Sequence, residues 1–288
     1  MADGAEATGW GALASLDREG VEARLDEVVR ENRFTIAVVF PVTGAALLLA
    51  SAWELLPPAL SFNPLLILVG VVVMRLPLVA GVAPLVDRRA AAALLALSAY
   101  AYGVEFVGIT TGQPYGFFEY GVALGPMVAG VPLALPVFFF PLVLNSYLLC
   151  LLLFSEATTS RWVRLPLVAA TVVAVDLVLD PGAVALGFWT YDGGGAVYGV
   201  PWSNFRGWVL SAVVAVGAFD IAFDREALLA RLDSCPFMLD DMVSFVILWG
   251  GVNAAFGNAV PVAVAGVFGA GLVAADRFDV PTRPRWLD

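Results

Sequence analysis

Residues 64–86 read PLLILVGVVVMRLPLVAGVAPLV, an apolar run that contains a single charged residue, Arg75. A helix of about 20 apolar residues is long enough to cross a ~30 Å hydrocarbon layer. This run therefore predicts a membrane-spanning helix. A charge near the middle of such a helix is costly in lipid, so we expect Arg75 to face the interior of a helical bundle beside an acidic partner.

Similar runs recur along the chain, which has 288 residues, is 60% hydrophobic and is only 14% charged. Soluble domains carry about 25% charged residues. We therefore predict an all-α polytopic membrane bundle of about eight helices, with one membrane domain over residues 34–275. The spans are expected at 34–56, 64–86, 90–109, 130–154, 163–186, 207–223, 240–257 and 259–275. The short link at 257–258 leaves open seven full spans plus a re-entrant piece.

The arginines give a test of topology that does not depend on hydropathy. Of the 15 basic residues, which are all arginine, 13 fall in alternate connections and in the two ends of the chain. By the positive-inside rule, this predicts an even number of crossings and two cytoplasmic termini. The arginines on the predicted cytoplasmic side are Arg18, Arg24, Arg30, Arg33, Arg88, Arg89, Arg161, Arg164, Arg225, Arg231, Arg277, Arg283 and Arg285.

The two ends outside the membrane domain are expected to be cytoplasmic. In residues 1–33, Val21, Leu25, Val28 and Val29 recur at helical spacing, which predicts an amphipathic helix on the membrane surface. Residues 276–288 form a short polar tail. A multi-pass protein of the cell membrane, in contact with the lipid bilayer, follows from this organisation.

The composition excludes several kinds of catalytic and binding site. With no histidine, imidazole cannot act as a base, a proton shuttle or a metal ligand. With no lysine, a Schiff base and a phosphate-binding loop are excluded. Cys150 and Cys235 are too few for a four-thiolate site, and nothing pairs them as a disulfide. The net charge of −10, without a basic stripe, argues against nucleic-acid binding, and an acidic chain without lysine suggests a salt-loving organism.

Polar side chains concentrate in two predicted outer segments that are rich in glycine and proline. Irregular backbone at membrane depth is tolerated only where it lines an enclosed cavity, so we expect these segments to wall a pocket. The first outer segment, residues 105–136, supplies the candidates Glu105, Tyr115, Glu119 and Tyr120. The second outer segment, residues 176–208, supplies Asp176, Asp180, Trp189, Tyr191, Asp192, Tyr198, Trp202, Asn204 and Arg206.

Each candidate also has a simpler explanation. The tryptophans and tyrosines are typical of an aromatic belt at the membrane interface. Asp176 and Asp180 lie one turn apart on the same helix face, and Asp176 could simply pair with Arg75. A buried carboxyl group without a full partner, in contrast, can remain protonated near neutral pH, which is what a general acid needs. Asn145, Asn253 and Asn258 could bind water or cap broken helices.

The two outer segments resemble the integral-membrane carotenoid hydratases. In the first outer segment the matching residues are Glu105, Thr111-Gly112, Tyr115-Gly116, Tyr120 and Gly130 to Leu133. In the second outer segment they are Asp176, Asp180-Pro181, Gly187, Trp189, Tyr198 to Pro201, Asn204 and Gly207-Trp208. The acidic, lysine-free composition is similar to the haloarchaeal branch, for which the implied reaction converts bisanhydrobacterioruberin to bacterioruberin.

The resemblance makes residues 34–275 a catalytic domain whose substrates are a long acyclic carotenoid and water, and it implies no cofactor and no metal. Hydration of a terminal alkene needs an acid, aromatic faces that stabilise a tertiary carbocation, and a group that positions water. We expect Asp176 or Asp180 to donate the proton and Glu105 with Asn204 to hold the water. Trp189, Tyr191 and Tyr198 would surround the cation, while Arg75 or Arg206 would keep a neighbouring carboxylate ionised. Other membrane enzymes of carotenoid synthesis are possible partners.

Two alternatives remain open at this point. A membrane prenyltransferase of the lycopene elongase type could use paired aspartates to hold Mg²⁺, and the pattern DxxxD occurs at Asp176/Asp180 and at Asp220/Asp224. At ~1.5 Å per residue, however, these pairs lie more than about 10 Å apart along the membrane normal, too far to share one metal cluster. A carotenoid-binding or transport protein is the other alternative, since buried carboxyl groups can relay protons or merely pair.

Overall fold

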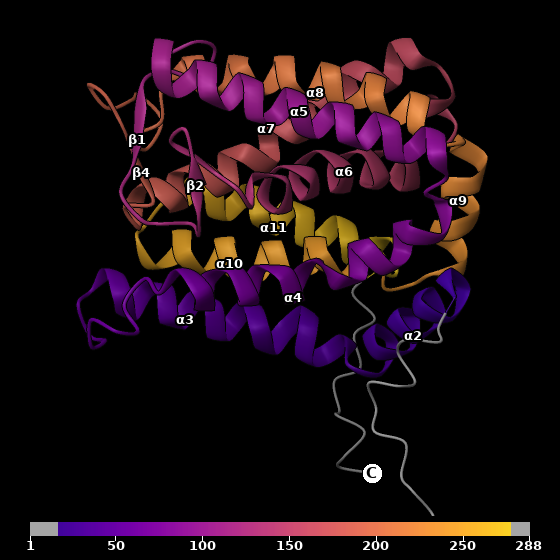
Figure 1. Cartoon of the computed structure of the whole chain (residues 1–288), viewed down its shortest axis with the longest axis horizontal. Coiled ribbons are helices and arrows are strands. Elements are labelled where there is room, and N and C mark those ends of the chain that lie inside the picture. The colour runs from indigo at the N-terminus through magenta and orange to yellow at the C-terminus, as the bar shows by residue number, and fades with distance from the viewer. Residues whose placement is uncertain (1–16, 278–288) are drawn as a thin grey trace, which may run out of the picture.

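The computed structural model describes residues 17–277, and α-helices account for most of them (Figure 1). The helices are α2 (Arg18–Glu31), α3 (Phe40–Ala52), α4 (Pro64–Val82), α5 (Arg88–Thr111), α6 (Leu135–Leu153), α7 (Arg161–Ala185), α8 (Trp202–Ala222), α9 (Arg225–Ser234), α10 (Asp240–Ala255) and α11 (Ala259–Ala274). A π-helical turn, Thr35–Val39, precedes α3, and 3-10 turns occupy Ala83–Leu85 and Ala157–Thr159. The strands are β1 (Phe118–Tyr120), β2 (Met127–Val128), β3 (Val131–Pro132) and β4 (Trp189–Tyr191).

Within residues 17–277, six helical segments are long and apolar enough to cross a membrane, which confirms a polytopic helical bundle. They are Thr35–Ala52, Pro64–Leu85, Arg88–Thr111, Leu135–Leu153, Arg161–Ala185 and Trp202–Ala222. The last two predicted spans fold as separate helices, α10 and α11, of 16 residues each. Such helices extend for about 24 Å, short of the hydrocarbon thickness, so the count of eight crossings stays a prediction.

Local sequence signals set several helix ends. Asn63 caps α4 because its side chain accepts hydrogen bonds from the backbone N–H groups of Leu65 and Leu66, and Pro64 occupies the first turn. Asp87 caps α5 in the same way, and α5 ends at Gly112, whose φ of 74° is left-handed. These signals set where α4 and α5 begin and where α5 ends.

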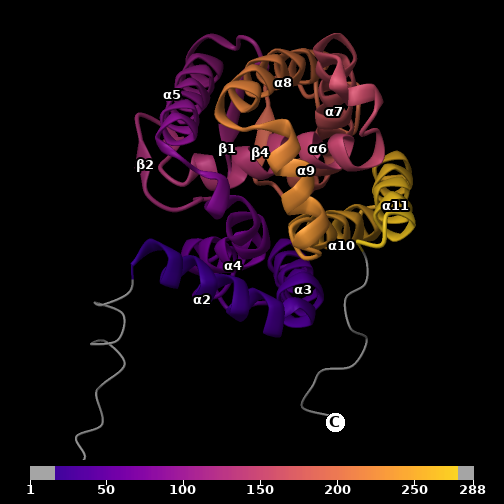
Figure 2. The same cartoon turned by 90° about the vertical axis from the view of Figure 1, so that its right-hand side faces the viewer.

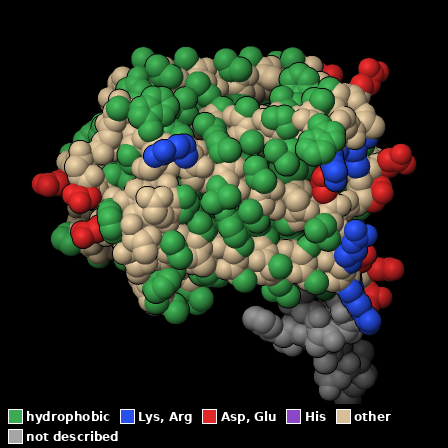
Figure 3. Space-filling model, turned by 90° about the horizontal axis from the view of Figure 1, so that it is seen from above, with side chains coloured by type: hydrophobic (Ala, Val, Ile, Leu, Met, Phe, Trp, Pro, Cys, Tyr) green, Lys and Arg blue, Asp and Glu red, His purple; other side chains and the backbone are tan. Residues whose placement is uncertain are grey.

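Helix α6 forms the centre of the bundle, and the other long helices surround it (Figure 2). Every residue from Pro141 to Leu151 is buried, including Asn145 and Ser146. Helices α5, α8 and α7 pack in succession on one side of α6, while α10 packs against α3, α4, α7 and α11. Charged side chains gather mainly at the two ends of the molecule, and apolar side chains cover the surface between them (Figure 3).

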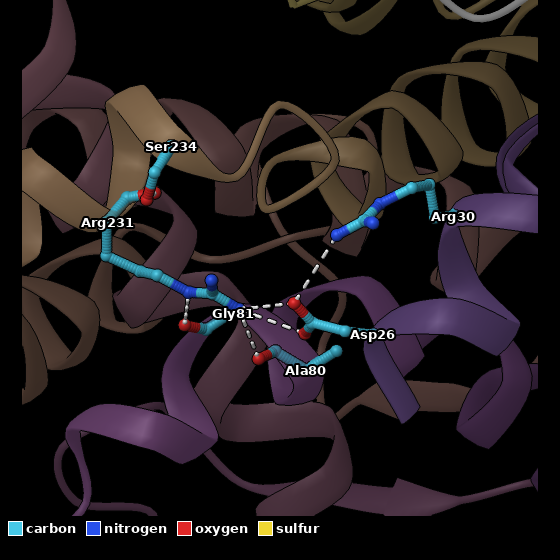
Figure 4. Close-up of polar contacts among 6 residues, drawn as sticks. All are labelled: Asp26, Arg30, Ala80, Gly81, Arg231 and Ser234. Atoms are coloured by element: carbon cyan, nitrogen blue, oxygen red, sulfur yellow. Dashed lines mark hydrogen bonds and ion pairs between the residues drawn. The ribbon is translucent and has the colours of Figure 1, made fainter. Parts of the chain in front are cut away.

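At one end of the bundle, arginine side chains connect α9, α2 and α4 (Figure 4). Arg231 on α9 bonds to the carboxylate of Asp26 on α2, at 2.9 and 3.1 Å, and to the backbone oxygens of Ala80 and Gly81 near the end of α4. The carbonyls at a helix C-terminus lack partners in their own helix, so this arginine satisfies two of them. The predicted N-terminal helix is confirmed as α2, in which Val29 is buried, whereas Val21 is 51% exposed.

The two outer segments meet at the opposite end of the bundle. Strands β1 and β4 pair antiparallel, with Phe118 opposite Tyr191 and Tyr120 opposite Trp189. Strands β2 and β3 form a hairpin that turns at Ala129 and Gly130, which both have positive φ, as the tight hairpin turn requires. The β1–β4 pair therefore joins the loop after α5 to the loop after α7, as the proposed pocket needs.

Candidate active site

A cavity of about 210 Å³ lies beneath the two outer segments. Its walls come from α3, α4, α5, α6, α7, α8 and α10 and from both outer segments. Most of the lining side chains are apolar or aromatic, and a few polar groups converge among them. Pockets for whole drug-sized ligands measure roughly 300–1,000 Å³, so this cavity has room for one end of a long molecule.

A pair of carboxyl groups forms the polar centre of the site. Asp176 and Asp180 lie one turn apart on α7 and are 0% and 3% exposed. The side-chain amide of Asn204, on α8, donates hydrogen bonds of 2.8 Å to one oxygen of each. Asp180 lines the cavity, whereas Asp176 lies behind it and keeps one oxygen, Oδ1, without a hydrogen-bond partner. Within residues 17–277, no arginine forms an ion pair with either group.

Tyr191, on β4, connects the carboxyl pair to the aromatic wall. Its hydroxyl donates a 2.7 Å hydrogen bond to Asp180. Burial raises the pKa of this phenol well above its usual value, and the nearby carboxyl groups of Asp180, Asp176 and Glu105 raise it further. Tyr191 therefore remains a hydrogen-bond donor. Three of the predicted acidic candidates, Asp176, Asp180 and Glu105, thus lie near this hydroxyl.

Glu105, on α5, is the third carboxyl group of the site, and it lines the cavity as Asp180 does. The hydroxyl of Tyr120 donates a hydrogen bond to it. Burial raises the pKa of the Tyr120 phenol, and the charge of Glu105 raises it further, so Tyr120 also stays protonated. The edge of Tyr120 meets the ring of Trp189 at a centroid distance of 6.4 Å, and the buried Nε1 of Trp189 has no hydrogen-bond partner.

The remaining walls are aromatic. Tyr115 is 3% exposed, and its hydroxyl lies 2.6 Å from the hydroxyl of Ser211 on α8. Phe139 stacks on Trp208 at a centroid distance of 5.7 Å and an angle of 23°. These faces can stabilise a positive charge in the cavity. The lining residues that sequence reasoning missed include Phe118, Phe139, Phe188 and Trp249, which are apolar and carry no signal that separates them from core residues.

Arg75 lines the cavity but pairs outside the carboxyl cluster. It forms an ion pair with Asp241 on α10, and the amide of Asn145 donates a 2.6 Å hydrogen bond to the same carboxylate. The expected acidic partner inside the bundle is thus confirmed. A pairing of Arg75 with Asp176 is wrong, because Asp241 occupies the guanidinium and Asn204 holds Asp176.

Five candidates lie outside the cavity and are exposed. They are Glu119, Asp192, Tyr198, Trp202 and Arg206. Glu119 points away because alternate side chains of a strand face opposite sides, and its neighbours Phe118 and Tyr120 face the cavity. Trp202 is 65% exposed, and its ring contacts the ring of Phe205. This exposure is expected for a tryptophan at the membrane interface.

The asparagines on α10 and at its end have structural contacts. Asn253 donates hydrogen bonds to the backbone oxygens of Val178, at 2.7 Å, and Trp249, at 2.8 Å. Asn258 donates to the side-chain oxygen of Asn253 at 2.9 Å. The asparagines thus support the segment of α7 that carries the carboxyl pair.

The second DxxxD pattern serves a different purpose. Asp220 forms an ion pair with Arg164 at 2.5 Å and accepts a 2.7 Å hydrogen bond from Tyr147. Asp224 caps α9 by accepting a hydrogen bond from the backbone of Ala227. Among residues 17–277, no three His, Cys, Asp or Glu side chains are grouped to hold a metal ion. Cys150 and Cys235 are both free and buried.

Comparison with known proteins identifies relatives of this chain. A family model described as "Carotenoid biosynthesis protein" matches residues 62–272. The chain is 59% identical over 280 residues to a bisanhydrobacterioruberin hydratase of Haloarcula japonica, a match that covers 97% of this chain and 95% of the relative. No solved structure matches the chain.

Proposed function

The chain belongs to the carotenoid biosynthesis protein family, and on this basis we propose that it is a carotenoid hydratase of the membrane. Its substrate is a long acyclic carotenoid, and the name of the Haloarcula japonica relative extends the proposal to bisanhydrobacterioruberin and its hydration to bacterioruberin. The observation that carries the proposal is the buried pair Asp176 and Asp180, bridged by Asn204 at the edge of an aromatic cavity.

Hydration of a trisubstituted terminal alkene needs little more than a proton and water. A proton adds to the less substituted carbon as the π electrons form the new C–H bond, and a tertiary carbocation remains. A water oxygen then bonds to the cation, and the resulting oxonium loses a proton. An acid in the correct protonation state, placed next to aromatic faces, accelerates such a step by about 10²–10⁴-fold.

Asp180 is the proton donor in this proposal. It lines the cavity, and two ionised carboxylates without a cation are strongly disfavoured in an apolar enclosure, so the pair holds at least one proton. Asp176 and Asn204 orient Asp180 from the side away from the cavity. The hydroxyl of Tyr191 donates a hydrogen bond to Asp180 and stabilises the negative charge left after proton transfer. Asp176 is therefore a positioning residue.

Glu105 is the general base. It accepts a hydrogen bond from Tyr120, as an ionised carboxylate does, and it lines the same cavity as Asp180. Glu105 positions the water and takes the proton that the oxonium loses, and transfer of this proton back to Asp180 restores the starting state. Trp189, Tyr115 and Trp208 present ring faces or edges around the cation.

The experiment that tests the proposal replaces single carboxyl groups by amides. Membranes that contain Asp180→Asn should hydrate the carotenoid at least about 10²-fold more slowly than wild type, measured by chromatography of the pigments. Asp233→Asn, an exposed residue of α9, is the matched control and should retain full activity. Full activity in Asp180→Asn would refute the assignment of Asp180 as the proton donor.

The proposed orientation places both termini in the cytoplasm and the carboxyl pair toward the outer face of the cell membrane. Helices α2 and α9 and the end of α4 meet at the end of the bundle where most arginines lie, and the β1–β4 pair lies at the other end. In this orientation α10 and α11 complete an even number of crossings. Accessibility of cysteines introduced at the two ends to an impermeant reagent tests it.

A further inference from the structure

The size of the cavity poses a question about the rest of the substrate. If the proposed function holds, the ligand is a stiff rod of many isoprene units. The cavity of about 210 Å³ is smaller than the roughly 300–1,000 Å³ of pockets that enclose drug-sized ligands. Only one end of the rod fits inside. The remainder must leave the cavity through an opening in its wall.

The lining residues show where this opening lies. Among the described residues that line the cavity, only three are exposed: Leu47 on α3 at 41%, Leu60 in the α3–α4 connection at 47%, and Leu66 on α4 at 47%. All other lining residues are buried or half-buried. The cavity therefore reaches the surface between α3 and α4, near the end of α3 and the start of α4.

The chemistry of this opening indicates what passes through it. All three rim side chains are leucines, and they lie on or beside helices that are long and apolar enough to span the membrane. A mouth open to water would be expected to carry polar side chains, whereas an apolar rim suits a hydrocarbon that arrives from the bilayer.

Two glycines leave space behind the rim. Gly44 on α3 and Gly70 on α4 both line the cavity. A Cβ atom at Gly70 would meet no other atom within 4 Å, and one at Gly44 would lie 3.2 Å from a methyl group of Leu248. Gly70 lies one turn after Leu66 on the same helix face, directly inward of the rim.

We propose that α3 and α4 form a lateral portal, bounded by Leu47, Leu60 and Leu66, through which a carotenoid enters from the bilayer. The polyene lies across Gly70 in the portal while one end group reaches Asp180. This inference rests on the proposed function and adds the route and the binding place of the unreactive part of the substrate.

The test fills the portal at Gly70 with side chains of increasing size. The variants Gly70→Ala, Gly70→Leu and Gly70→Phe are compared with the same series at Gly217 on α8, an exposed glycine that also has no atom within 4 Å of an added Cβ and does not line the cavity. The two substrates are bisanhydrobacterioruberin and myrcene, a short acyclic terpene with a terminal trisubstituted double bond. Thermal unfolding in detergent confirms that each variant is folded.

The portal proposal predicts a loss of catalytic efficiency that grows with side-chain size at Gly70 and that affects the long substrate more than the short one. For the carotenoid, kcat/KM should fall with side-chain size at Gly70, by about tenfold or more for Gly70→Phe, while the Gly217 series stays flat. Turnover of myrcene should change by less than about threefold, because a short substrate fits within the cavity. Equal carotenoid activity in the two series overturns the portal, and so does a parallel loss for both substrates. If wild type does not hydrate the carotenoid, the result contradicts the proposed function instead.

Discussion

The ion pair between Arg75 on α4 and Asp241 on α10 permits a quantitative prediction about the bundle. Asp241 is fully buried, and the side chain of Arg75 is only 12% exposed. The variant Asp241→Asn keeps the volume of the side chain but leaves the guanidinium without a counter-charge. Loss of one partner from a buried pair costs about 3–5 kcal/mol. Because whole domains are stable by about 5–15 kcal/mol, this variant should lose at least a fifth of its free energy of unfolding.

The assay is unfolding in a mild detergent, followed by helical circular dichroism. The double variant Arg75→Met/Asp241→Asn is the matched control, since it removes both charges and leaves the Asn145 amide an uncharged partner. We expect it to recover most of the lost stability, because apolar replacement of a buried pair is often neutral. If Asp241→Asn unfolds within about 1 kcal/mol of wild type, or if the double variant is no more stable than Asp241→Asn, the reasoning is refuted.

Three further predictions follow from single contacts. Tyr191→Phe removes the hydroxyl that donates a hydrogen bond to Asp180 and should lower kcat by about tenfold, as turnover would show. Its free energy of unfolding should fall by only about 1 kcal/mol, because Asp180 keeps the hydrogen bond from Asn204. Arg231→Ala removes the bonds to Asp26 and to the end of α4 and should lower the free energy of unfolding by about 1–3 kcal/mol in a denaturant titration, whereas Arg231→Lys restores only part of the loss. Burial raises the pKa of the phenols of Tyr115, Tyr120 and Tyr191. Their contribution to stability is present below the usual pKa of about 10 and declines as the pH rises above it, so these phenols should ionise only as the helical signal is lost. Ionisation of all 7 tyrosines with the helical signal intact would contradict this.

Much of the fold could be predicted from local sequence. Apolar runs and the caps at Asn63 and Asp87 mark the long helices, because span length and capping are local properties. The last two spans were harder to predict. The run at 240–257 begins with Asp240 and Asp241, which would end a span in lipid. They are buried here because Arg33 and Arg75 neutralise them, and these partners lie far away in sequence. The short polar helix α9 carries no hydropathy signal and was not predicted.

The candidate site was predicted in part for a similar reason. Asp176, Asp180 and Asn204 were expected together because one helix turn joins the aspartates and one outer segment contains all three. The side on which Glu119 lies depends on the register of β1 against β4, which a three-residue strand does not reveal. Trp249 enters the cavity from α10, and only the packing of the whole bundle brings it there.

Several buried polar atoms of residues 17–277 lack a hydrogen-bond partner, and two of them belong to the candidate site. Near Pro181, the side-chain amide of Asn253 donates a hydrogen bond to the backbone carbonyl of Val178 on α7. At the site itself, in contrast, the Asp176 Oδ1 acceptor and the Trp189 Nε1 donor are buried without partners in the described chain. Each such group costs about 1–3 kcal/mol. In the proposed mechanism these two atoms offer hydrogen-bonding capacity to a water molecule beside the carboxyl pair.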